Sequence, residues 1–366
     1  ELKALYAGAD AAQEAPSVAE MARAAVTQPV SVTGGEGWLK PADLAAARKN
    51  EALAAKIDRT TYECVRDLAV LERWITAAYE AGHVAIDTET SAVDPMQADL
   101  VGISLAVAPG KACYVPLQHR GGTDLFGGGM LEGQIPLDQA LAALKPLLAD
   151  PGVLKIGQNL KYDLVLLKRY GLDVAPVDDT MLISYALDAG GNSHGMDRLS
   201  ELHLGHETIT FAQVAGTGKA QVTFDKVALD KATDYAAEDA DVTLRLWRTL
   251  KPRLAAEGRT TVYETLERPL IAVLARMEAH GIAIDRQILS RLSGRFAQKA
   301  AALEADIHAL AGESFNPGSP KQLGEILFGK LGLPGGKKTR TGQWSTDART
   351  LEDLAAEGHD LPRHIV

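Results

Sequence analysis

One short stretch, VAIDTET at residues 84–90, constrains this chain more than any other. Its β-branched and apolar residues predict a strand, and because side chains alternate between the faces of a strand, Asp87 and Glu89 must point the same way. Two carboxylates on one buried face repel each other unless a cation lies between them, and such oxygen ligands suit Mg²⁺ or Mn²⁺. The stretch alone also fits a solvated strand end, so the rest of the chain has to distinguish the two interpretations.

The composition is that of a globular protein with more than one domain. Its 366 residues are 46% apolar and 23% charged. The net charge of −10 does not favour a nucleic-acid binder as a whole, although a basic groove can lie beside an acidic site. No run of about 18 apolar residues predicts a membrane helix, and the first residues show no secretory signal. Cys64 and Cys113 form no CxxC or Cys/His pattern, which favours a reducing cytoplasm and argues against structural zinc.

Changes in sequence character divide the chain into three parts. Residues 1–56 are rich in Ala, with scattered Pro and Gly, and predict a linker or a loosely packed arm. Residues 57–258 alternate strand and helix patterns and predict a mixed α/β domain, whereas residues 259–366 show helical patterns almost throughout. The expected strands are 84–88, 100–107, 112–116 and 153–157, the first three forming an antiparallel meander. Because the chain starts at Glu1 rather than Met, we expect both ends to be cuts in a longer polypeptide.

Two further acidic motifs lie within the α/β part. QNLKYD follows the fourth expected strand and places Asp163 in the first turn of a helix, where a carboxylate also gains from the helix dipole alone. In YAAED, Tyr235 and Asp239 lie one helical turn apart on the same face, a pattern that a simple buried Tyr–Asp pair would share. If the three motifs converge, four carboxylates can hold two divalent cations, the arrangement used for phosphodiester hydrolysis.

The residues of these motifs, and their order along the chain, resemble those of a known family. VAIDTET, QNLKYD and YAAEDAD resemble the three exonuclease motifs of the DEDD superfamily, with Tyr in the third. Segments between them, such as DDTMLISY and MDRLSELHLGHETITF, are similar to the proofreading domain of the bacterial DNA polymerase I family (family A), and FNPGSPKQLGEILF resembles the start of its polymerase thumb. The resemblance runs from about Ile57 to the end. It implies an α/β fold class, a ribonuclease-H-like mixed sheet flanked by helices, followed by an incomplete all-helical thumb region.

The resemblance also implies a role for each motif residue. Asp87, Glu89, Asp163 and Asp239 would hold two divalent metal ions, Mg²⁺ or Mn²⁺ with Zn²⁺ an option at one site, and Asp87 would bridge both. Tyr235 would orient the attacking water as a protonated phenol. The expected substrate contacts are Thr88, Val93, Gln158, Asn159, Tyr162 and Phe211.

Three of these contacts have a specific expectation or an alternative. Val93 would wedge against the terminal base, at a position where the family more often carries Leu. Phe211 would stack on a base, although it could instead be an ordinary anchor of its loop. Asn159 could line the path of the strand or could satisfy local backbone groups.

Other charged residues receive simpler interpretations. The basic loop 337–340 could grip duplex phosphates or could be solvated surface. The histidines between residues 194 and 206 show no spacing typical of metal ligands. Glu238 and Asp241 are expected to face solvent beside the site.

The implied function is 3′–5′ exonuclease activity, the removal of nucleotides from a single-stranded or frayed 3′ DNA end with release of nucleoside 5′-monophosphates. The setting would be proofreading by a monomeric repair and replication polymerase in the bacterial cytoplasm, associated with the nucleoid and not with membrane. The polymerase carboxylates would lie beyond Val366, so this chain is not expected to synthesise DNA. Two alternatives stay open: an exoribonuclease of the RNase D kind, which shares the five residues, and a silent DNA-binding scaffold, which typically loses motif carboxylates.

Overall fold

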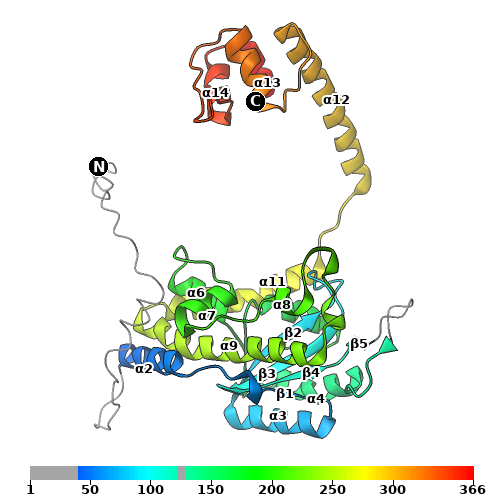
Figure 1. Cartoon of the computed structure of the whole chain (residues 1–366), viewed down its shortest axis with the longest axis vertical. Helices are drawn as coiled ribbons and strands as arrows, with labels where there is room; N and C mark the ends of the chain where they lie inside the picture. Colours follow the sequence, from blue (N-terminus) through cyan, green and yellow to red (C-terminus); the bar gives the residue numbers. More distant parts are fainter. Residues whose placement is uncertain (1–39, 122–128) are drawn as a thin grey trace. The chain divides into compact units, whose positions relative to one another are not determined.

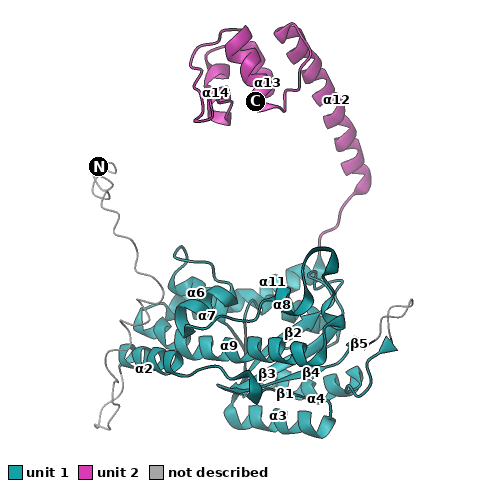
Figure 2. Ribbon diagram, viewed as in Figure 1, with its two compact units in different colours: residues 1–281 teal, residues 282–366 magenta. Residues whose placement is uncertain are grey.

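The computed structural model describes residues 40–121 and 129–366, which form two compact units (Figures 1 and 2). The first unit ends at Gly281 and the second runs from Ile282 to Val366. Each unit has its own hydrophobic core. Residues 1–39, most of the expected arm, lie outside the described residues. Among the described helices none is both long and apolar enough to cross a membrane.

A six-stranded mixed sheet organises the first unit, in the order β1-β4-β3-β2-β7-β8. Strands β2, β3 and β4 form the expected antiparallel meander, and β7 and β8 extend the sheet in parallel to β2. The short β1 pairs in parallel with β4 at the other edge. The strands are β1 (Glu63–Cys64), β2 (His83–Thr90), β3 (Leu100–Ala108), β4 (Lys111–Pro116), β7 (Leu154–Gly157) and β8 (Val177–Asp179).

Helices cover both faces of this sheet (Figure 1). One face packs against α3, α4 and α5 around a core that includes Leu71, Leu144 and Leu166. The other face packs against the long helix α9 through small residues, which let helix and sheet approach closely. The helices of the unit are α2 (Pro41–Ala54), α3 (Leu68–Ala81), α4 (Leu137–Ala149), α5 (Lys161–Arg169), α6 (Thr180–Leu187), α7 (Met196–Leu204), α8 (Phe211–Ala215), α9 (Leu229–Ala256), α10 (Thr260–Val262) and α11 (Arg268–His280).

The elements begin and end where side chains satisfy free backbone groups. Asp67 caps α3 by accepting from the amide of Ala69, and Gly82 ends the helix in the left-handed conformation, with φ of 68°. Asp179 caps α6, as the sequence predicts, and also accepts from the amides of Asn159 and Leu160. One buried carboxylate therefore holds both the start of α6 and the turn between β7 and α5.

The second unit is all helical, apart from an isolated bridge between Lys338 and Trp344. Its longest helix begins after Asp285, whose side chain accepts from two backbone amides, and ends at Gly312 in the left-handed conformation. Its core joins residues such as Ile307, Leu327 and Leu351. The elements are α12 (Arg286–Ala311), α13 (Pro320–Gly324), a π-helical turn at Glu325–Lys330, α14 (Ala348–Ala356) and α15 (Asp360–Ile365).

Candidate active site

Three acidic side chains meet where β2 faces α9. Because side chains alternate along β2, Asp87 and Glu89 point to the face of the sheet that α9 covers. Ala85 lies on the same face and packs against alanines of α9. Asp239 comes from α9. Oxygen atoms of these three carboxylates all lie within 4.8 Å of one another, close enough to share one cation. The shared direction expected for Asp87 and Glu89 is therefore present in the fold.

Asp163 approaches the same site from another side. It lies in the first turn of α5, which follows β7, and its carboxylate is buried. The Thr88 hydroxyl donates to Asp163 from β2. Asp163 is not one of the three acids that lie within 4.8 Å of one another, but it lines a common cavity with Asp87 and Glu89. The structure thus brings all four acids to one region, with Asp163 set apart from the other three.

Burial and repulsion act together on these carboxyl groups. Burial raises the pKa of Asp87 to about 7. Burial, followed by repulsion from Asp87 and Asp163, raises the pKa of Glu89 well above its usual range, and burial with repulsion from Asp87 and Glu89 does the same for Asp239. The pKa of Asp163 is also raised, first by burial and then by Asp87. In the absence of a cation the site therefore favours protonated acids.

The donor set fits a divalent metal ion. Within the described residues, Glu89 Oε1 is buried without a hydrogen-bond partner. A buried carboxylate oxygen with no donor is costly, and a hard cation would satisfy it. Asp87, Glu89 and Asp239 supply oxygen ligands only, the chemistry that Mg²⁺ and Mn²⁺ prefer. The geometry of these acids is thus explained by a metal ion better than by hydrogen bonding.

Tyr235 lies one turn before Asp239 on α9 and belongs to an aromatic cluster. Its ring centroid lies 5.7 Å from that of Phe224 and 6.4 Å from that of Phe211. Burial, followed by repulsion from Asp239, raises the pKa of the Tyr235 phenol far above its ordinary value. The phenol therefore stays protonated and can act as a hydrogen-bond donor at neutral pH.

A cavity of about 580 Å³ adjoins the acids. All six expected substrate contacts line it: Thr88, Val93, Gln158, Asn159, Tyr162 and Phe211. Val93 is 93% exposed on this cavity wall. The Tyr162 hydroxyl lies 2.7 Å from Thr90 Oγ1 and donates to the Ala92 carbonyl, which fixes the loop that presents Val93.

Two of these lining residues are already committed to protein contacts. The Gln158 amide donates to the His194 carbonyl and accepts from the Thr180 hydroxyl. Asn159 adopts a left-handed φ of 57°, and its backbone amide donates to Asp179. Asn159 is thus held by its backbone, and the structure leaves its side chain on the cavity wall.

The sequence analysis missed one segment of the cavity wall. Residues 221–224 line the cavity beside Phe211. Phe224 is buried and its ring lies 6.4 Å from that of Phe211, centroid to centroid. The clue available in the sequence was this isolated aromatic residue in an otherwise polar stretch.

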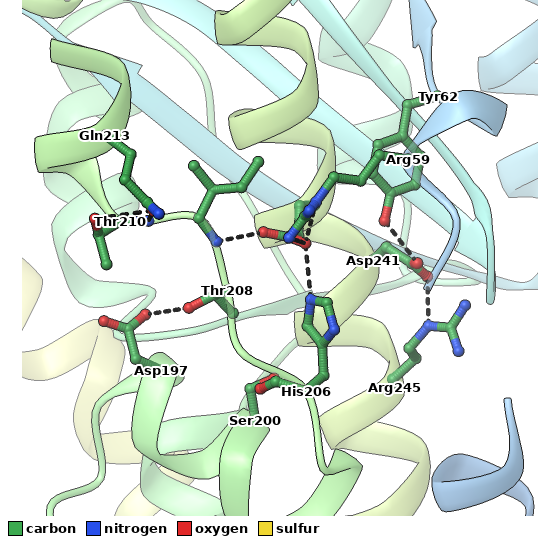
Figure 3. Close-up of polar contacts among 12 residues, drawn as sticks. Arg59, Tyr62, Asp197, Ser200, His206, Thr208, Thr210, Gln213, Asp241 and Arg245 are labelled. Carbon is green, nitrogen blue, oxygen red and sulfur yellow. Dashed lines mark hydrogen bonds and ion pairs between the residues drawn. The ribbon is translucent and has the colours of Figure 1, made fainter. Parts of the chain in front are cut away.

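The expectation that Glu238 and Asp241 face solvent is wrong, because both side chains are fully buried. Glu238 accepts from Arg59, His206 and the backbone of the loop before α8. Asp241 accepts from Tyr62, Arg245 and the Gly110 amide. Figure 3 shows these two groups of contacts on adjoining sides of α9. Paired donors explain how two carboxylates are buried without a metal ion.

A mixed sheet covered by helices, with a carboxylate cluster at the end of a central strand, defines the class of protein: a ribonuclease-H-like nuclease. The comparisons with known proteins agree. Residues 62–255 match the family model described as 3′–5′ exonuclease, and residues 286–366 match the model for DNA polymerase family A. The chain belongs to the family of DNA polymerase I and carries its 3′–5′ exonuclease domain.

Individual relatives give the extent of this similarity. DNA polymerase I of Rhizobium leguminosarum is 62% identical over 341 residues, and that of Pseudomonas aeruginosa is 44% identical over 318 residues. These alignments cover 90% and 86% of this chain but 34% of each relative, so the chain spans about a third of their length. A solved structure of the POL domain of Pol1 from M. smegmatis, in complex with DNA primer-template and dNTP, matches with a TM-score of 0.63 at 26% identity. That match covers 81% of this chain and 46% of the other.

Proposed function

We propose that this chain hydrolyses the terminal phosphodiester of a 3′ DNA end and releases a nucleoside 5′-monophosphate. The observation that carries the proposal is the cluster of Asp87, Glu89 and Asp239, with their oxygens within 4.8 Å of one another, beside a cavity large enough for a nucleotide. The relatives of this chain are DNA polymerases, which makes DNA the substrate to test first. In a longer polymerase this activity would serve proofreading.

The acids would hold two divalent cations, Mg²⁺ or Mn²⁺. Asp87, Glu89 and Asp239 would hold one ion, and Asp163 would join Asp87 in holding the second. When bound, these cations would supply electrostatic stabilisation of the charge that develops on the phosphoryl group and the leaving 3′ oxygen. Thr88 supports this arrangement because its hydroxyl donates to Asp163 and fixes the orientation of that carboxylate.

The remaining residues would orient water and substrate. The Tyr235 phenol, protonated at neutral pH, would donate a hydrogen bond to the attacking water, and the Glu89 carboxylate would accept from the same water. Phe211 would stack on a base near the 3′ end. The exposed Val93 would press against the terminal base and separate it from its neighbour.

The test is degradation of a 5′-labelled single-stranded DNA oligonucleotide with Mg²⁺ or Mn²⁺, compared with the same sequence in RNA. Asp163→Ala and Tyr235→Phe should each lower kcat by about 10²-fold or more, since the first removes a metal ligand and the second the donor to water. Tyr79→Phe, an exposed tyrosine on α3, is the matched control and should leave the rate unchanged.

Isothermal titration of Mn²⁺ separates binding from turnover. The wild-type chain should bind Mn²⁺, and Asp163→Ala should lose part of that binding. Degradation that survives Asp163→Ala undiminished would refute the assignment. Faster cleavage of RNA than of DNA would instead favour an exoribonuclease.

A further inference from the structure

Glu238, which precedes the acid Asp239 on α9, is a buried charge that the proposed chemistry does not use. Its side chain is fully buried, and it points away from the cavity toward the loop between α7 and α8. Burial opposes its ionisation, but hydrogen bonds from His206 and Ile209 and the charge of Arg59 outweigh burial and lower the pKa of Glu238. A buried carboxylate with so many donors holds its partners in fixed positions.

The donors to Glu238 come from segments far apart in the sequence. Arg59, in the 3₁₀ turn Arg59–Thr61, contacts Glu238 Oε1 through Nε at 2.8 Å and Nη2 at 2.7 Å. His206 Nε2 lies 2.8 Å from the same oxygen. The amide of Ile209 donates to the other oxygen, Oε2, at 2.7 Å. Figure 3 shows Arg59 and His206 on the same side of α9, one above and one below the carboxylate oxygen that both contact.

The anchored loop leads directly into the cavity wall. Ile209 is followed by Thr210, which caps α8 in a capping box with Gln213. The first residue of α8 is Phe211, which lines the cavity and lies edge-on to Tyr235, with ring centroids 6.4 Å apart. Only Thr210 therefore separates the residue bonded to Glu238 from the aromatic residue proposed to stack on the substrate. A second contact, from Thr208 to Asp197, holds the loop to α7.

We infer that Glu238 is a positioning residue, which holds the loop at residues 206–211 against α9 and thereby keeps Phe211 in place for the 3′-terminal nucleotides of a single strand. This inference rests on the proposed function, since it assigns Phe211 a substrate. Glu238 itself touches neither the acids' metal ions nor the substrate. Replacing Glu238 should therefore weaken substrate binding rather than slow the chemical step, because the ring that it positions would contact a base and not the reacting phosphate.

Steady-state kinetics on a single-stranded DNA oligonucleotide test this role. Glu238→Gln keeps the shape of the side chain but replaces an acceptor oxygen by a donor. It should raise KM about tenfold, the loss expected for one stacked base, and change kcat less than about threefold. Phe211→Ala should have the same effect, and the double variant should be no worse than Phe211→Ala alone because both act through one contact.

Hydrogen–deuterium exchange of the segment 205–215 gives a measurement that does not depend on activity. Glu238→Gln should speed exchange there because the single oxygen of Gln can accept either from Arg59 and His206 or from the Ile209 amide, but not from both sets. Asp241→Asn is the matched control, an equally buried acid three residues along the same helix whose partners lie outside this loop. It should lower the melting temperature but leave KM, and exchange in 205–215, unchanged.

The outcomes separate this inference from the function on which it rests. A wild-type chain that cleaves no 3′ end would refute the function, whereas exchange would still report whether the anchor exists. A fall in kcat with unchanged KM would mean that Glu238 acts through Asp239, and additive effects with Phe211→Ala would mean that it acts elsewhere; either overturns the inference. If Glu238→Gln does not fold, His206→Gln removes a second anchor of the loop, and an unchanged KM in that variant would also overturn it.

Discussion

At the scale of single residues, the four acids of the site oppose the stability of the metal-free chain. Each is buried or partly buried near the others, and the pKa of each lies above its ordinary value. An acid whose folded pKa exceeds its unfolded pKa binds more protons in the folded state at intermediate pH. Without metal, the free energy of unfolding contributed by these groups therefore falls as pH rises from about 4 to about 7 or above.

This cost predicts that removing one charge stabilises the metal-free chain. Asp239→Asn keeps the shape of a side chain that is 5% exposed and removes its repulsion with Asp87 and Glu89. In EDTA at pH 8 we expect the free energy of unfolding of the variant to exceed that of wild type by about 1–3 kcal/mol, the size of effect seen for other uncompensated buried charges. The difference should shrink toward pH 4, where the wild-type acids are protonated. Melting curves with EDTA or Mg²⁺ measure both effects.

The control for this prediction is an exposed acid. Asp173→Asn changes a carboxylate that is 74% exposed and pairs with Lys168 at the surface, so its effect should stay within about 0.5 kcal/mol. Mg²⁺ should raise the melting temperatures of wild type and of Asp173→Asn. It should raise the melting temperature of Asp239→Asn much less. Equal stabilisation of all three by Mg²⁺ would mean that Asp239 holds no metal.

At the scale of elements, the packing of β3 against β4 supports the aromatic side of the site. Gly102 on β3 is opposite Glu89 in the register with β2, and the Tyr114 ring from β4 lies over it. A methyl group on Gly102 would clash with the hydroxyl and the ring of Tyr114. Tyr114 in turn packs against Phe224, with ring centroids 6.3 Å apart, and Phe224 packs against Tyr235. A strand glycine thus sets the position of three aromatic rings.

Gly102→Ala should therefore destabilise the unit and disturb the site together. Forcing Tyr114 out of its place costs about 1–3 kcal/mol, as overpacking does in other cores, and should lower cleavage of single-stranded DNA. Gly190→Ala is the control, since among the described atoms none lies within 4 Å of the added methyl and its φ is not left-handed. Thermal unfolding and kcat/KM would check both variants. A Gly102→Ala chain as stable as Gly190→Ala would show that the rings relax without cost.

How far the sequence predicted these elements depends on their length. The strands expected at 84–88, 100–107, 112–116 and 153–157 are present, because each has enough residues for a pattern. β1 has two residues and β8 three, too few for alternation to be recognised. Within residues 1–56, the helix α2 packs against α9 although its apolar face is weak in the sequence.

The sequence predicts the parts of the site that lie on a single strand or helix. It does not predict the contacts made between several elements. Alternation on β2 and one helical turn on α9 are local, so Asp87 and Glu89, and likewise Tyr235 and Asp239, could be paired in advance. The burial of Glu238 depends on donors such as Arg59, 179 residues away in sequence, which no local pattern contains.

At the scale of the whole molecule, all residues assigned to the nuclease site belong to the first unit. The acids, Tyr235 and every residue that lines the 580 Å³ cavity precede Gly281. The second unit has its own core around residues such as Leu327 and Leu351. Because each unit buries its own apolar residues, we expect the first to fold without the second.

This separation predicts that a chain ending at Gly281 remains a nuclease. Its kcat and KM for a single-stranded DNA oligonucleotide should stay within about twofold of those of the full 366 residues, because no proposed ligand or substrate contact is lost. Its melting temperature should match one transition of the full chain. The shortened chain carrying Asp163→Ala should be inactive, which excludes a contaminating nuclease. A fall of more than about tenfold in kcat/KM, in a shortened chain that keeps its melting temperature, would mean that the second unit supplies binding energy for the single strand.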